Sequence, residues 1–181
     1  MPKVVDLRVD IDTEDWHPGG TWIAGGVLAG FVTLRLRSQT VIAYRPFGLN
    51  NSAIAIARSV YLDHHAATDQ TALAARWPMF FCAARLRNHC GVISDFSVRR
   101  RGPNVELSNF YGCALPAGAH IVVPWTSWAR AALGFAAIVY RRCPPIKQGI
   151  PQRHVGQYRR TRADLLAATR MARRALALRA V

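Results

Sequence analysis

The sequence predicts an α+β fold: a mostly antiparallel sheet packed against one central apolar helix, with a basic helix at the carboxyl end. Two observations predict this class. Residues 5–12 alternate between apolar and charged side chains, which is the period-two pattern of a half-buried strand. Trp125–Arg142 has apolar residues at helical spacing around most of its circumference, as expected for a helix that covers a sheet.

Two further strands and a first helix are predicted in the first half of the chain. Val27–Arg37 and Val41–Phe47 have apolar residues at strand spacing, with a polar turn between them. Asn50–His65 begins with polar capping residues and favours a helix, with a strand over Ala53–Leu62 as the alternative. A short helix is expected over Gln70–Trp77.

A hairpin is the clearest feature of the middle of the chain. Met79–Leu86 is a candidate buried strand, and Val92–Arg100 and Val105–Tyr111 alternate in step around a turn at residues 101–104. We expect the tip of this hairpin to present Arg99, Arg100 and Arg101 together.

The central helix follows the short apolar run Ile121–Val123. Thr126 or Ser127 is the expected amino-terminal cap, and the two prolines after Cys143 end the helix. Its core stripe is expected to consist of Trp128, Ala131, Ala132, Phe135, Ile138 and Val139.

The chain is predicted to consist of three regions. At 181 residues a single domain is the default, and we assign it to residues 1–143. Residues 144–160 are rich in proline, glycine and glutamine and are predicted to be a linker. Residues 161–181 are predicted to form the basic helix, with Thr161 as its cap and Asp164 in its first turn.

Charge is the strongest compositional signal. The formal net charge is +14, from 24 basic and 10 acidic residues, and residues 141–181 carry eleven basic residues against one acid. A field of this sign favours polyanions such as nucleic acid, an acidic protein surface or anionic lipid. The alternative is an arginine-rich composition without functional meaning.

Location and redox state follow from what the sequence lacks. It contains no uncharged apolar run of 18 residues, so no membrane span is expected. Its first residues are charged and strand-like rather than a secretory or transit signal, which favours the cytoplasm. The four cysteines include no CxxC pair and are expected to be free, buried thiols.

Asp63–Asp69 contains an HHxxxD pattern, which resembles the active-site motif of condensation-domain and chloramphenicol-acetyltransferase-like acyltransferases. The resemblance implies that His65 is the general base and that Asp69 organises the local structure. Gln70 stands where that family has glycine.

The same stretch resembles two other families. Tyr61–Thr68 is similar to the YLDxxATT stretch of cysteine desulfurases, although the lysine motif for their cofactor is missing. The triplet at residues 63–65 resembles the signature of DHH phosphoesterases, in which Asp10 and Asp12 would mimic upstream metal ligands. A polar loop between elements is the alternative to all three.

No metal or cofactor is predicted. A zinc site from Cys82, His89, Cys90 and Cys113 has spacings that fit no zinc finger. The acidic residues 10–15 lack the glycine and terminal glutamate of a calcium loop. The glycines of residues 19–26 are not followed by the lysine of a phosphate-binding loop.

The expected function is therefore a non-enzymatic basic module that binds a polyanion, with nucleic acid as the first choice. Arginine binds phosphate through its planar fork, and an aromatic ring stacks on unpaired bases. The predicted binding residues are Arg99, Arg100, Arg101, Arg153, Tyr158, Arg159, Arg160, Arg170, Arg173 and Arg174.

Two alternatives remain open. One is a protein-interaction module for an acidic protein, such as an inhibitor, an immunity-type protein or a subunit of a larger assembly. The other is an acyltransferase-like enzyme that uses His65 and Asp69. The oligomeric state is not predicted.

Overall fold

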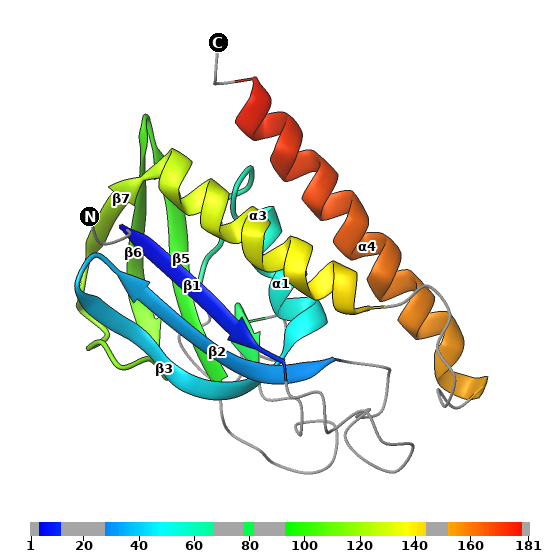
Figure 1. Ribbon diagram of the computed structural model, residues 1–181. Helices are drawn as coiled ribbons and strands as arrows, with labels where there is room; N and C mark the ends of the chain where they lie inside the picture. Colours follow the sequence, from blue (N-terminus) through cyan, green and yellow to red (C-terminus); the bar gives the residue numbers. More distant parts are fainter. Residues whose placement is uncertain (1–3, 12–27, 67–77, 82–92, 144–151, 179–181) are drawn as a thin grey trace.

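The structure is a computed structural model. It describes residues 4–11, 28–66, 78–81, 93–143 and 152–178. Within these residues, all named strand pairs are antiparallel, in two sheets, and three helices pack beside them (Figure 1). The predicted α+β class with antiparallel strands is confirmed. None of the described helices is long and apolar enough to cross a membrane.

The first sheet has the order β1-β2-β3. Its strands are β1 (Val5–Asp10), β2 (Ala29–Leu36) and β3 (Gln39–Gly48). The register pairs Leu7 with Leu34 and Asp6 with Arg35, so apolar partners share one face and charged partners share the other. Because Leu34 is completely buried while Arg35 is exposed, the first of these faces is the core side.

The second sheet contains the predicted hairpin. Its strands are β4 (Phe80–Phe81), β5 (Ile93–Arg101), β6 (Asn104–Tyr111) and β7 (Ile121–Pro124), in that order. The hairpin loop consists of Gly102 and Pro103, and Gly102 has a φ of 58°, a conformation that costs glycine little. The predicted helix at 70–77, and the part of the predicted strand beyond Phe81, lie outside the described residues.

Three helices are described. They are α1 (Leu49–Arg58), α3 (Trp125–Arg142) and α4 (Gln152–Ala177). The preference for a helix over a strand after Asn50 is confirmed by α1. The predicted cap of α3 is wrong: the helix begins directly after Pro124, without a capping side chain. The backbone N–H of Trp125 instead donates to the carbonyl of Pro103 at 2.8 Å, which anchors the start of α3 on the hairpin loop.

Helix α3 contacts β1 of the first sheet, β6 and β7 of the second, and both other helices (Figure 1). Trp128 and Phe135 are buried and pack against Phe96 and Phe80, with ring centroids 6.2 and 6.3 Å apart. The indole N–H of Trp128 donates to Ser59 Oγ at 3.0 Å, which ties α3 to the end of α1. The buried face of α3 consists of Trp125, Trp128, Ala129, Ala132, Phe135, Ala136 and Val139.

Helix α4 differs from its prediction. It begins at Gln152, so residues 152–160 are helical rather than linker, and Thr161 lies inside the helix rather than capping it. Tyr158 is only 1% exposed and extends the buried stripe toward the amino end. This burial stabilises the helix despite its glycine and polar residues, because tertiary packing outweighs intrinsic propensity. Leu165 and Ala172 belong to the same hydrophobic cluster as α1 and α3, so α4 is part of the core.

Candidate functional site

The three hairpin arginines do not all lie on one side of the hairpin. Successive residues of a strand face opposite sides, which the sequence prediction did not take into account. The Arg100 guanidinium carbon lies 5.1 Å from the centre of the Trp125 ring, against the core, while Arg101 Nε donates to Glu106 at 3.2 Å. Arg99 and Arg100 are each only half-exposed. The prediction that the three present one surface is therefore wrong.

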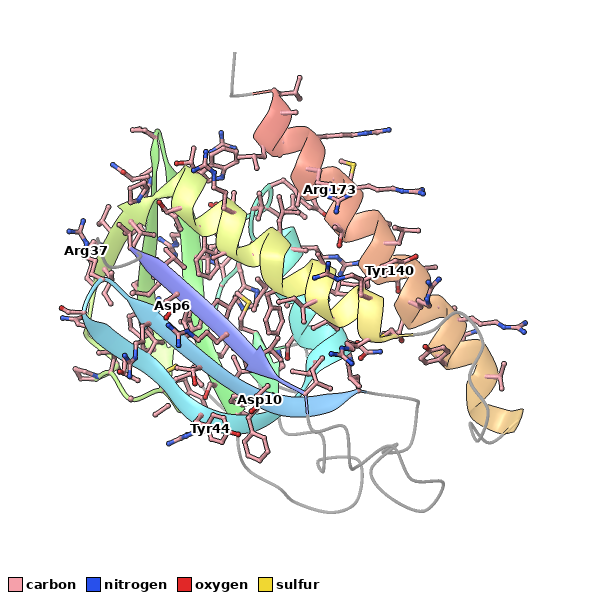
Figure 2. All side chains as sticks on the ribbon, viewed as in Figure 1. Asp6, Asp10, Arg37, Tyr44, Tyr140 and Arg173 are labelled. Atoms are coloured by element: carbon pink, nitrogen blue, oxygen red, sulfur yellow. The ribbon has the colours of Figure 1, made fainter. Side chains whose placement is uncertain are left out.

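Helix α4 carries most of the other predicted residues. Five of its arginines are exposed and form no ion pair within the described chain: Arg159, Arg160, Arg170, Arg173 and Arg174. Figure 2 labels Arg173 and shows nitrogen-tipped side chains projecting from α4 away from α3. The side chain of Arg153 lies outside the described residues. Tyr158 was predicted to stack on bases, but that prediction is wrong because its ring is buried.

Four of these arginines lie on one side of α4, which we call the arginine face: Arg159, Arg170, Arg173 and Arg174. At about 100° per residue they fall within about 100° of arc around the helix axis. At about 1.5 Å per residue they extend over about 22 Å. Asp164, the one acid of α4, lies toward the side of the helix that faces α1.

A cleft of about 600 Å³ lies beside the arginine face, between α1 and α4. Its third wall is the segment Leu62–His65, which follows α1. The polar and charged lining residues are Asn51, Arg58, Ser59, Asp63, His64, His65, Arg160, Thr161 and Asp164. The cleft therefore gathers two histidines, two arginines and two carboxylates from segments distant in the sequence.

His64 is the best-positioned of these groups. Its Nε2 lies 2.8 Å from Asp95 Oδ1, and the side chains are 17% and 1% exposed. The same oxygen accepts the backbone N–H groups of Met79 at 2.9 Å and Phe96 at 3.0 Å. An ionised carboxylate is an acceptor only, so the proton of a neutral His64 ring lies on Nε2. Nδ1 then carries a lone pair and has no hydrogen-bond partner within the described chain.

The backbone around His64 is held by β5. His64 and Val98 exchange two backbone hydrogen bonds, of 2.9 and 2.8 Å. Asp63 Oδ1 accepts the backbone N–H of Arg100 at 3.0 Å, and the N–H of Ala66 donates to Ser97 Oγ at 3.0 Å. This segment is thus paired with the edge of a strand. A histidine positioned in this way can accept or donate a proton at a fixed point in the cleft.

The histidine that has a carboxylate partner is not the one that the sequence predicted. The acyltransferase resemblance gave the base role to His65, which is exposed in the cleft, whereas Asp95 bonds His64. Asp69 lies outside the described residues. Sequence reasoning found His64 only as part of the double-histidine motif, without a role of its own, and it missed Asp95 and Arg58. The available signal was Asp95 itself, the one charged residue in the Ile93–Val98 part of β5.

Cys113 and Glu106, which do not line the cleft, have shifted pKa values. Burial raises the pKa of the Cys113 thiol to about 12, and the charge of Asp95 acts in the same direction. Hydrogen bonds from His120 and then Arg101 lower the pKa of the exposed Glu106 carboxyl. In the described part of the chain, no three histidine, cysteine or acidic side chains are grouped as metal ligands would be.

Comparison with known proteins finds no matching family model, no matching curated protein and no matching solved structure. The arginine face and the cleft are therefore the features that indicate a function.

Proposed function

We propose that this chain is a cytoplasmic protein that binds nucleic acid through the arginine face of α4. The observation that carries the proposal is a row of exposed arginines that form no ion pair within the described chain. Because α4 is packed in the core through Leu165 and Ala172, these side chains extend from a fixed scaffold.

The chemistry of the face favours phosphates. A guanidinium group binds a phosphate with two parallel hydrogen bonds, and arginine is less strongly hydrated than lysine. The face extends over about 22 Å, and duplex DNA carries one charge per about 1.7 Å of its axis, so several phosphates lie within reach. A formal net charge of +14 adds long-range attraction for a polyanion.

Salt-dependent binding tests the proposal. Fluorescence anisotropy would measure the affinity for a labelled single-stranded oligonucleotide between about 50 and 200 mM salt. Over this range counterion release changes the affinity of a phosphate-binding protein strongly. Each phosphate contact contributes about −0.7 to the slope of log affinity against log salt. Replacing Arg170 and Arg174 with glutamine should therefore reduce the magnitude of that slope by about 1.4.

A charge-matched variant provides the control. Arg8→Gln with Arg35→Gln removes the same charge from the exposed face of the first sheet. This control should keep most of the slope of the unmodified protein. An affinity independent of salt, or equal losses in the two double variants, would contradict the proposal. Stoichiometric capture of one acidic protein after nuclease treatment, without oligonucleotide binding, would favour the protein-interaction alternative.

A further inference from the structure

The cleft between α1 and α4 contains the components of general acid–base chemistry beside the arginine face. His64 is oriented by the buried Asp95, and His65 lines the same cleft. Arg58 and Arg160 line it from α1 and α4 and form no ion pair within the described chain. The arrangement therefore combines a proton acceptor with two positive charges.

The described cleft residues do not supply an available nucleophile. Ser59 Oγ is buried, donates to the carbonyl of Ile56 at 2.7 Å and accepts the indole N–H of Trp128. Thr161 also has an interaction within the protein. No cysteine is among the described residues that line the cleft. A substrate that carries its own nucleophile next to a phosphate suits such a site, and RNA does so through its ribose 2′-hydroxyl.

We propose that this cleft cleaves RNA by transesterification. Nδ1 of the neutral His64 ring accepts the proton of the 2′-hydroxyl, and that oxygen attacks the adjacent phosphorus. The bond from phosphorus to the 5′ oxygen breaks, and a protonated His65 donates its proton to this leaving oxygen. The products are a 2′,3′-cyclic phosphate and a 5′-hydroxyl, and proton exchange with water restores both rings.

The remaining groups have supporting roles. Arg58 and Arg160 stabilise the additional negative charge on the phosphorane, which is present only in the transition state. Asp95 is a positioning residue: it holds the proton on Nε2 of His64, keeps Nδ1 available, and stabilises the imidazolium that forms. The inference rests on the proposed function, because the arginine face supplies the affinity for the nucleic acid.

The experiment follows a 5′-labelled single-stranded RNA with the full-length protein in the presence of a chelator. Cleavage should produce 2′,3′-cyclic phosphate ends, which mass spectrometry identifies. His64→Asn should lower kcat/KM by about 100-fold or more, the lower end of what one positioned general base provides. Asp95→Asn keeps the size of the side chain and should lower kcat at least about tenfold while KM changes little.

Two variants keep the test independent of folding and of contaminating nuclease. Arg58 is exposed, so Arg58→Gln should fold normally and still lower kcat. His120→Asn, purified in parallel, removes a histidine that is bonded to Glu106 and does not line the cleft. It should cleave RNA at the rate of the unmodified protein.

The outcomes separate the two proposals. RNA with 2′-O-methyl groups has no 2′-hydroxyl, and should be bound as tightly as normal RNA without being cleaved. Binding of this analogue together with cleavage of normal RNA at equal rates by the unmodified protein and His64→Asn would overturn the catalytic inference alone. The same holds if normal RNA is bound but not cleaved. Absence of binding to any oligonucleotide would overturn the proposed function and the inference together.

Discussion

Substitution of Leu165 tests whether α4 is packed in the core. The Leu165 side chain is completely buried in the cluster that α4 shares with α1 and α3. Leu165→Ala removes three carbon atoms, which at about 0.8 kcal/mol each is about 2.4 kcal/mol of lost transfer free energy. Because the surrounding helices close the void only in part, the total loss should be about 3 kcal/mol. The melting temperature should fall by about 6–12 °C.

Urea unfolding measured by circular dichroism would determine this loss of free energy. The control is Leu178→Ala, which truncates a leucine that is 81% exposed and should change stability by less than about 0.5 kcal/mol. Equal effects from the two substitutions would refute the packing of α4 in the core. The rigid arginine face that the proposed function needs would then be lost as well.

Three further outcomes are expected. Gly112→Ala should destabilise the protein much more than Gly102→Ala, in thermal melts, because both have positive φ but only at Gly112 would the new methyl group collide with a backbone carbonyl of β5. Burial raises the pKa of Cys113 to about 12, above its unfolded value of about 8.5, so this residue's contribution to stability should be intact below about pH 8.5 and decline toward pH 12. Peptide mapping should accordingly show slower alkylation of Cys113 in the folded protein than in urea at about pH 9. His120→Ala should raise the pKa of Glu106 toward its ordinary value, which carboxyl NMR titration would measure.

Strong local patterns predicted the fold best. The alternation in β1 and around the hairpin predicted the strands, and the apolar circumference of Trp125–Arg142 predicted α3, although not its amino-terminal cap. The start of α4 was missed because glycine and glutamine in residues 152–160 have the composition of a linker. That segment is helical because Tyr158 is buried against the rest of the core. Such a tertiary contact leaves no local signal in the sequence.

The candidate site was predicted only in part. Charge composition indicated the arginines of α4, but not that β5 places Arg100 against Trp125 and Arg101 beside Glu106. The double histidine was found by its motif. Asp95 was not, because its pairing with His64 depends on how the segment after α1 lies against a strand far along the chain.

The separation of the cleft walls in the sequence also bears on synthesis. One wall comes from Asn51–His65 and the other from Arg160–Asp164, so most of the chain must be made before the two can meet. Contacts between such distant segments form slowly, and domains fold as their residues emerge from the ribosome. A nascent chain would therefore present its histidines without the arginine of the opposite wall. If the cleft acts on RNA, the ribosome that makes this protein would be exposed to the complete site only after residues 160–164 have emerged.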